Sequence, residues 1–268
     1  MSQDKLVDLH CHILPGLDDG SPDLEHSLNL AREAVADGVT HILATPHHLD
    51  NEYVNHATDV VKAAADFQAQ LDAQGIELAV FPGQEVHING DLLQRYDDLL
   101  GIDENKHYML LEFPHGEVPG YAKRLIFDLR KVGTTPVIVH PERNRGFQKN
   151  LDLLYDFISE GALAQLTATS YLGGFGSKVQ EISEQLVAHN LVQIMASDAH
   201  TLKGRKFVLG EAFDKLTKKM GSEVAQQFEL NAENLINGQR VVAQDFTRPS
   251  QGSISQRKER KKKRFFFF

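Results

Sequence analysis

The sequence lacks features that several common classes of protein require. It has a single cysteine, Cys11, so no disulfide can form within the chain, and this composition indicates a reducing compartment. No apolar run approaches the roughly 20 residues that span a bilayer. Residues 1–5 lack the apolar core of a signal peptide. We therefore expect the body of the protein to be cytoplasmic.

Several motifs of phosphate chemistry are also missing. A cysteine-nucleophile phosphatase uses the pattern Cys-x5-Arg, which would place arginine at position 17, where the chain has Leu17. The sequence contains no Gly-x-x-x-x-Gly-Lys-Ser/Thr loop and no Gly-x-Gly-x-x-Gly after an apolar run typical of a strand. These absences exclude a cysteine phosphatase and the commonest nucleotide-binding loops.

Positive charge is scarce except near the C-terminus. The net charge is −9, but residues 257–264 carry +6, so the other 260 residues carry −15. Such an acidic body argues against a nucleic-acid-binding surface. We expect one domain over residues 1–243 and a flexible tail over 244–268 that is polybasic and ends in four phenylalanines. Two roles stay open for the tail, namely peripheral contact with the inner face of an anionic membrane and a solvated extension.

Short apolar runs alternate with amphipathic segments along most of the chain. This alternation predicts parallel strands joined by helical crossovers. An open sheet would spread its strand ends along an edge, whereas a barrel brings them together at one rim, so we favour an α/β fold with a seven-stranded (β/α) barrel. The expected strands begin near Leu6 and then occupy 41–45, 76–81, 108–111, 136–139, 163–168 and 191–195. The expected helices occupy 22–37, 56–74, 121–132, 151–160, 177–189, 205–220 and 222–239.

Six of the seven expected strands end in histidine, aspartate or glutamate. His10 and His12 alternate in an extended segment, so both imidazoles point to the same side, and Asp198 and His200 repeat this spacing. The donors expected at the rim are His10, His12, Asp19, His47, Glu85, Glu112, His140, Asp198 and His200. Nine nitrogen and oxygen donors exceed the needs of one ion, which predicts a centre of two or three metals.

Spacing leaves parts of this centre undetermined. It does not separate Asp18 from Asp19, or His47 from His48. The mixed imidazole and carboxylate donors fit Mn²⁺, Fe²⁺ and Zn²⁺ alike. Several cations at one site favour phosphoester hydrolysis. Arg143 and Arg205 follow the donors closely in sequence and are expected to bind phosphate oxygens, with a surface salt bridge as the alternative.

Taken together, these motifs are those of a known family. The sequence resembles the polymerase and histidinol phosphatase (PHP) superfamily, and within it the CpsB/CapC-type protein-tyrosine phosphatases of bacterial capsule and exopolysaccharide operons. The resemblance extends from residue 8 to about residue 205. The motifs that carry it are Asp8-x-His10-x-His12, Asp18-Asp19-Gly20, Thr45-Pro46-His47, Gly83-Gln84-Glu85, Leu111-Glu112-Phe113, His140-Pro141-Glu142-Arg143 and Ser197-Asp198-Ala199-His200.

The resemblance implies a distorted seven-stranded barrel with three metal ions, often manganese. It implies that a metal-bridging hydroxide attacks phosphotyrosine while Arg143 and Arg205 bind the phosphate. The implied substrate is the tyrosine-rich tail of a membrane-associated tyrosine autokinase. The implied ligands are His10, His12, Glu85 and Asp198 for the first ion, Glu85, Glu112 and His140 for the second, and Asp19, His47 and His200 for the third.

Two other functions stay open on the sequence alone. The first is a PHP phosphoesterase that acts on a small metabolite such as histidinol phosphate. The second is a regulatory protein that binds metal and the kinase without turnover. A metal-dependent amidohydrolase fits less well, because no lysine stands at the end of an expected strand.

Overall fold

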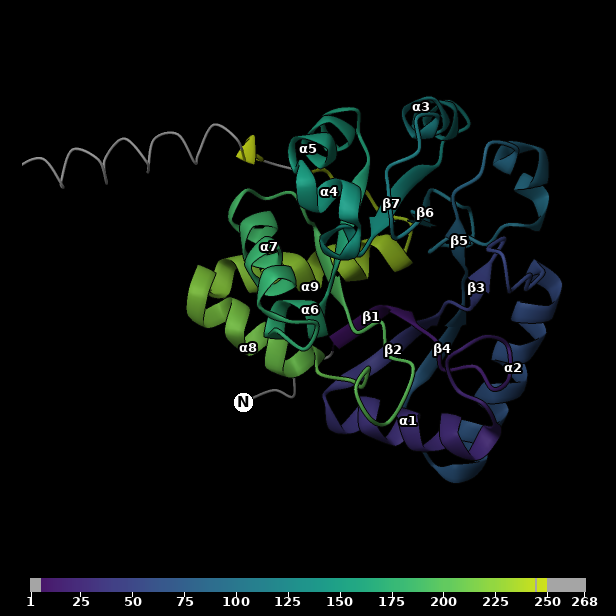
Figure 1. Cartoon of the computed structure of the whole chain (residues 1–268). Coiled ribbons are helices and arrows are strands. Elements are labelled where there is room, and N and C mark those ends of the chain that lie inside the picture. Colours follow the sequence, from purple (N-terminus) through teal and green to yellow (C-terminus); the bar gives the residue numbers. More distant parts are fainter. Residues whose placement is uncertain (1–5, 244, 250–268) are drawn as a thin grey trace, which may run out of the picture.

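The computed structural model of the 268-residue chain describes residues 6–243 and 245–249 (Figure 1). Most of the expected C-terminal tail, namely residue 244 and residues 250–268, lies outside the described residues, as do residues 1–5. Within the described residues, no helix is long and apolar enough to cross a membrane.

The described strands form two sheets in which every pair of neighbouring strands is parallel. The first sheet has the order β1-β2-β4 and contains β1 (Leu6–Cys11), β2 (Val39–Ala44) and β4 (Ala79–Pro82). The second has the order β3-β5-β6-β7-β8-β9 and contains β3 (His47–His48), β5 (Glu85–His87), β6 (Tyr108–Glu112), β7 (Thr135–Val139), β8 (Leu163–Thr167) and β9 (Ile194–Ala196).

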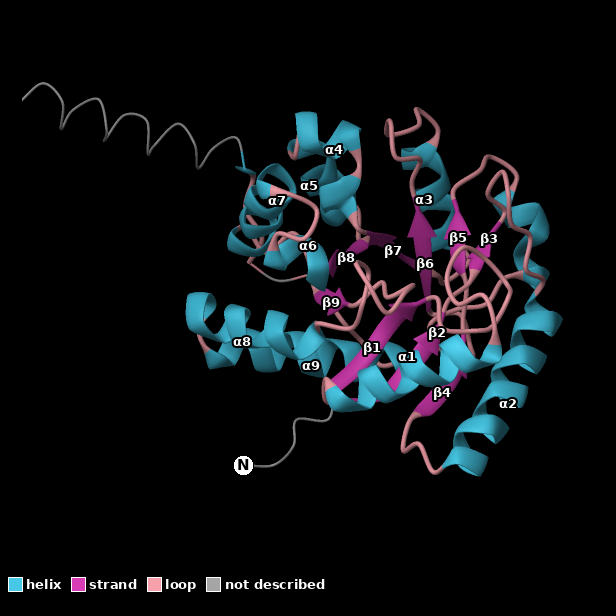
Figure 2. Ribbon diagram, turned by 60° about the horizontal axis from the view of Figure 1, so that its bottom comes forward, coloured by secondary structure: helices cyan, strands magenta, loops and turns pink. Residues whose placement is uncertain are grey.

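Helices surround the central group of strands (Figure 2). The longer helices are α1 (Leu24–Ala36), α2 (Ala57–Gln74), α3 (Ala122–Lys131), α5 (Asp152–Ser159), α7 (Ser177–Ala188), α8 (Leu209–Met220) and α9 (Ser222–Ile236). Short helical pieces are η1 (Leu92–Asp98), η2 (Pro141–Arg143), α4 (Arg145–Lys149) and α6 (Ala168–Leu172). The expected alternation of strands and helices is therefore confirmed.

The single seven-stranded barrel expected from the sequence is not what the strand pairing shows. The chain passes from β2 to β3 through Thr45-Pro46, and from β4 to β5 through Gly83-Gln84. At each break it leaves the first sheet and joins the second. Pro46 has no N–H for a ladder, which favours a break there. The observed architecture is an α/β fold with two parallel sheets. An isolated parallel bridge between Cys11 of β1 and Ala199 joins the first sheet to the segment that follows β9.

Two helices begin later than the sequence predicts. Helix α1 begins at Leu24 rather than Pro22, because the side chain of Asp23 accepts a hydrogen bond from the His26 N–H and caps the helix. Helix α8 begins at Leu209 rather than Arg205, because the Asp37 carboxylate accepts hydrogen bonds from the N–H groups of Leu209 and Gly210. Arg205 consequently lies in a loop.

The hydrophobic core reaches between the two sheets. One cluster of buried side chains combines Leu9 and Leu43 of the first sheet with Leu110, Val137 and Leu163 of the second. Side chains near the end of α9, among them Ala232 and Leu235, belong to the same cluster. Helix α9 also packs against β1 and β9. Apolar packing thus fills the interior between the strands and leaves their carboxyl ends for polar groups.

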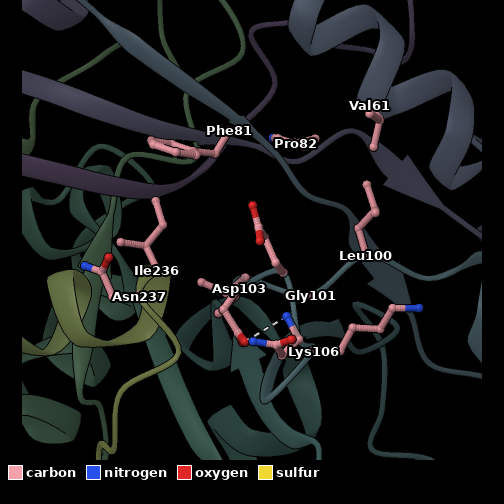
Figure 3. Close-up of a pocket in the computed structure, with 12 residues that line it drawn as sticks. Val61, Phe81, Pro82, Leu100, Gly101, Asp103, Lys106, Ile236 and Asn237 are labelled. Atoms are coloured by element: carbon pink, nitrogen blue, oxygen red, sulfur yellow. Dashed lines mark hydrogen bonds between the residues drawn. The ribbon is translucent and has the colours of Figure 1, made fainter.

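A cleft of about 550 Å³ lies beside β4, one of the two edge strands of the first sheet (Figure 3). Its lining includes Phe81 and Pro82 of β4, Leu100, and Ile236 at the end of α9. None of the nine metal donors expected from the sequence lines it. The cleft is therefore separate from the rim where the donors were expected.

The C-terminal segment after α9 is fixed to β6 by one buried phenol. The Tyr108 hydroxyl donates to the Gln239 carbonyl at 2.8 Å and accepts from the Val241 N–H at 2.9 Å. We expect Tyr108→Phe to lower the free energy of unfolding by about 1–3 kcal/mol, because the buried N–H of Val241 loses its partner. Urea unfolding measures this change. Tyr155→Phe is the control, since the ring of Tyr155 makes its contacts with Arg248 and Phe246; equal losses in both variants would contradict the prediction.

Candidate metal centre

All nine donors expected from the sequence converge at the carboxyl ends of the strands. Within the described residues they fall into four overlapping groups whose ligand atoms lie within 4.8 Å of one another. The groups are His12, Asp19, His47 and His200; His10, Glu85 and His140; His10, His12 and Asp198; and His47, Glu85 and Glu112. Asp18 and His48 belong to none of these groups, so the geometry favours Asp19 and His47 in the two pairs that spacing left open.

Glu85 lies at the middle of the assembly. Its Oε2 is 3.3 Å from Nε2 of both His10 and His12 and 3.0 Å from Nδ1 of His47. Its Oε1 is 2.7 Å from Nε2 of His140. Its two oxygens therefore face different imidazoles, and the carboxylate offers a donor atom to each of two groups.

Asp198 faces the His10 and His12 pair from another side. Its Oδ1 is 3.6 Å from Nε2 of each of the two histidines. The Nε2 atoms of His10 and His12 are themselves 3.3 Å apart. Two imidazole nitrogens and two carboxylates therefore point at one common, buried location, which is the arrangement of donors around a cation.

Asp19 marks the open side of the centre. Its Oδ1 is 3.4 Å from Nε2 of both His47 and His200. The side chain of Asp19 is 49% exposed, whereas those of Glu85 and Asp198 are at most 1% exposed. The group that contains Asp19, His47 and His200 thus lies between the buried carboxylates and solvent.

Several buried atoms here are left for a ligand other than a protein group. His47 Nδ1, Glu85 Oε2 and His200 Nε2 have no hydrogen-bond partner among the described residues, although they lie close to other donor atoms. Buried polar atoms are normally satisfied, and a cation between them satisfies several at once. The residues present therefore fit bound divalent cations.

The charges of the site lead to the same conclusion. Burial would lower the pKa of His10, but Glu85 and Asp198 raise it to about 9. Burial likewise opposes protonation of His47, yet Glu85 and Asp19 raise its pKa to about 12. The buried carboxylates thus require positive charge beside them, and cations that bind here displace protons from the imidazoles.

Arg143 and Arg205 both lie at this site and both contact Asp198. Arg143 Nη1 bonds Asp198 Oδ2, and Arg205 Nη2 is 2.8 Å from each of the two carboxylate oxygens. Burial would raise the pKa of Asp198, but these two guanidinium groups hold it well below its usual value. The surface salt bridge considered for the arginines is thus replaced by an ion pair inside the centre.

Two of the candidate donors have a left-handed backbone. His140 has φ 35° and Asp198 has φ 52°, a region that residues with a Cβ rarely adopt. The Asp198 N–H donates to the His10 carbonyl, and the His140 carbonyl accepts from the Arg143 N–H. Such conformations persist only where the surroundings fix them, and they gather at functional sites.

Sequence reasoning missed two side chains that orient the histidines. Asp18 Oδ2 is 2.6 Å from Nδ1 of His12, and Gln165 Oε1 is 2.8 Å from Nδ1 of His10. An acceptor at Nδ1 holds the proton there and leaves Nε2 free to bind an ion. The Asp18-Asp19 pair was a visible signal, whereas Gln165 lies on β8, the one expected strand without a ligand at its end.

Two further histidines, His87 and His115, border the centre. His87 Nδ1 is 3.1 Å from Glu112 Oε2, and the His115 ring is 6.4 Å from the ring of His140. Cys11, in contrast, is fully buried in the main hydrophobic core, as its alternation with His10 and His12 predicts.

Comparison with known proteins gives consistent matches over nearly the whole described chain. The family model "Capsular polysaccharide synthesis, CpsB/CapC" matches residues 6–237. The tyrosine-protein phosphatase YwqE of Bacillus subtilis is 43% identical over 243 residues, which cover 89% of this chain and 94% of that protein. The putative tyrosine-protein phosphatase CapC of Staphylococcus aureus is 34% identical over 241 residues, with the same coverage.

Solved structures agree with these matches. A crystal structure from work on YwqE of Bacillus subtilis and CpsB of Streptococcus pneumoniae, described as unique metal-dependent tyrosine phosphatases, has a TM-score of 0.88 and 41% identity, covering 91% of this chain and 99% of that one. A mutant of the organophosphorus hydrolase from Deinococcus radiodurans has a TM-score of 0.52 at 11% identity, covering 88% and 93%. The second likeness concerns the fold alone.

The contact between Gln165 and His10 generates a prediction about metal affinity. We expect Gln165→Leu to weaken Mn²⁺ binding by about 10- to 100-fold, because the His10 imidazole loses the acceptor that fixes its tautomer. Titration calorimetry on metal-free protein measures the dissociation constant. Gln193→Leu is the matched control, since Gln193 is also buried but bonds the backbone of Ala164 and Asn190. A dissociation constant unchanged in Gln165→Leu would show that this contact does not support metal binding.

Proposed function

The chain belongs to the CpsB/CapC family of capsular polysaccharide synthesis proteins, and from that membership we propose that it is a metal-dependent phosphatase that hydrolyses phosphotyrosine in proteins. The observation that carries the proposal is the convergence of nine imidazole and carboxylate donors beside two arginines. The names of the relatives and the 0.88 TM-score of the metal-dependent phosphatase structure support it.

We assign the donors to three ions on the basis of their grouping. His10, His12, Glu85 and Asp198 would hold the first, Glu85, Glu112 and His140 the second, and Asp19, His47 and His200 the third. Manganese is proposed, and the same donors suit Fe²⁺ and Zn²⁺. When bound, divalent cations at such a site supply positive charge to phosphoryl oxygens and make water a stronger acid.

Arg143 and Arg205 are proposed to bind the non-bridging oxygens of the phosphate. Both guanidinium groups already contact Asp198 inside the donor cluster, so we expect them to reach a phosphate held by the cations. Their fork of N–H donors matches a phosphate group. Tyrosine has a pKa near 10, so a tyrosinate leaves with little help from a proton donor. The nucleophile implied by the family resemblance stays a prediction.

The proposed protein substrate is the tyrosine-phosphorylated tail of a membrane-associated bacterial tyrosine kinase. The capsular family description and the phosphatase names of the relatives favour this reading over the small-metabolite alternative. A cytoplasmic location is proposed with it. Peripheral membrane contact through the C-terminal tail is also a proposal, and it concerns residues that mostly lie outside the described part of the chain.

We further propose that the two sheets are parts of one distorted seven-stranded barrel within a domain of residues 1–243. If β2 with β3 and β4 with β5 are each counted as one broken strand, the described strands occupy seven positions. The bridge between Cys11 and Ala199 brings the end of β1 next to the segment after β9. This description agrees with the likeness in fold to the organophosphorus hydrolase structure.

The assignment of His140 can be tested by mutation. Loss of a residue that only hydrogen-bonds a metal ligand lowers activity about 10- to 100-fold. We expect His140→Ala to lower kcat for a phosphotyrosine peptide in Mn²⁺ by more than this, because a direct ligand is removed. His189→Ala is the control, since His189 bonds Thr247 and belongs to none of the donor groups. Turnover by His140→Ala at the wild-type rate would refute the assigned role of His140. Absence of turnover in the wild type itself would favour a regulatory function.

The choice of substrate is tested with the same preparation. The wild-type enzyme should show a higher kcat/KM for a phosphotyrosine peptide than for histidinol phosphate. The reverse order would favour the small-metabolite alternative. Metal analysis of the purified protein, made alongside, counts the ions and identifies them.

A further inference from the structure

The proposed function leaves one part of the substrate without a partner. The cations and the two arginines account for the phosphate group, but nothing so far recognises the phenyl ring of phosphotyrosine. A ring attached to that phosphate must leave the centre on its exposed side. The exposed side is defined by Asp19, Arg205, Arg143 and His47, whose side chains are 49%, 26%, 15% and 14% exposed, while the other seven side chains of the site are at most 7% exposed.

Two aromatic side chains adjoin this exposed side. The Tyr53 ring is stacked on His47, with centroids 6.1 Å apart and an interplanar angle of 16°. The Phe175 ring lies 5.1 Å from the guanidinium carbon of Arg143. Both rings are partly buried. One therefore packs against a metal donor and the other against a phosphate-binding arginine.

The segment that carries Tyr53 is fixed by its neighbours. Val54 forms an antiparallel bridge with His48. The side-chain amide of Asn55 donates to the carbonyls of Leu17 and His47, at 3.1 and 2.8 Å. The residues that follow Tyr53 are thus bonded to Leu17, close to Asp19, and to the chain at His47 and His48.

The segment that carries Phe175 is equally constrained. Phe175 stands between glycines, of which Gly173 and Gly176 have φ of 94° and 93°, a conformation that requires glycine. The N–H of Gly176 donates to the Gly173 carbonyl, and the N–H of Gly174 donates to the Thr169 carbonyl of α6. The turn therefore presents Phe175 at a defined place beside Arg143.

We propose that Tyr53 and Phe175 form an aromatic subsite that receives the phenyl ring of the substrate and so selects phosphotyrosine over phosphate esters without a ring. This inference rests on the proposed function, because the phosphate end of the substrate fixes where the ring emerges. Aromatic rings attract one another in stacked and edge-to-face arrangements. A serine or threonine phosphate offers no ring to such a subsite, although it offers the same phosphate.

The test uses two phosphonates that the enzyme does not hydrolyse. Phenylphosphonate carries a ring and methylphosphonate does not, and calorimetry gives the dissociation constant of each with the manganese-loaded full-length protein. We expect Tyr53→Leu and Phe175→Leu each to weaken phenylphosphonate about two- to tenfold, while methylphosphonate and inorganic phosphate change by less than about twofold. Tyr53→Phe keeps the ring and should bind phenylphosphonate as the wild type does.

Phe127→Leu is the matched control for the loss of a ring beside a cation. Phe127 is 56% exposed on α3 and lies between Arg124 and Lys131. It should leave all three dissociation constants unchanged. Metal content of each variant, measured in parallel, confirms that the centre is intact.

The outcomes separate this inference from the proposed function. If the leucine variants bind phenylphosphonate as the wild type does, the aromatic subsite is wrong. If Phe175→Leu weakens all three anions equally, Phe175 only positions Arg143, and the subsite is again wrong. A wild type that prefers phenylphosphonate through these two rings but does not hydrolyse a phosphotyrosine peptide would support the subsite and overturn the proposed function.

Discussion

The structure depends on the burial of two carboxylates, Glu85 and Asp198, in one place. A buried carboxylate is costly unless positive charge and hydrogen-bond donors lie beside it. Several elements supply such groups: His10 lies in β1 and His12 follows it, His140 follows β7, and Arg143 and Arg205 come from turns. Charge compensation therefore explains why segments far apart in sequence meet at this point.

The broken strands serve the same requirement. Glu85 directly follows the break between β4 and β5, in which Gln84 is buried. The side-chain N–H of Gln84 donates to the Asn55 carbonyl, and its side-chain oxygen accepts from the Leu100 N–H. These bonds replace the ladder that is lost where the chain changes sheets. The break is thus a fixed part of the fold, and it determines the direction in which the Glu85 carboxylate points.

Much of this arrangement could be predicted from the sequence because parallel strands place their carboxyl ends on one side. Histidines and acids at six strand ends had to meet once the strands were parallel, and the structure brings all nine together. The choice of His47 over His48 depends on which way adjacent residues point, and a shift of one residue in register reverses that. The pairing of β3 with β5 sets this register, with His47 opposite Glu85 and His48 opposite Val86.

Other features depend on contacts between distant residues and have no local signal. Helix α8 begins at Leu209 because its N–H donates to the carboxylate of Asp37, 172 positions earlier in the chain. Gln165 and His10, which are in contact, are 155 positions apart. The division into two sheets likewise depends on how the segments around Pro46 and Gly83 pack. At Gly83 an added Cβ would lie 2.7 Å from the Leu43 side chain, so this close approach is specific to the folded chain.

Each of the two arginines proposed to bind phosphate is connected through the backbone to a proposed metal ligand. Arg143 follows His140 through the single turn η2, in which the Arg143 N–H donates to the His140 carbonyl. Arg205 follows His200 through a turn in which the N–H groups of His200 and Thr201 both donate to the Arg205 carbonyl. Each arginine is therefore held by the backbone of a candidate metal donor. A displacement of either histidine would move the adjacent guanidinium, so the proposed metal-binding and phosphate-binding groups share one backbone support.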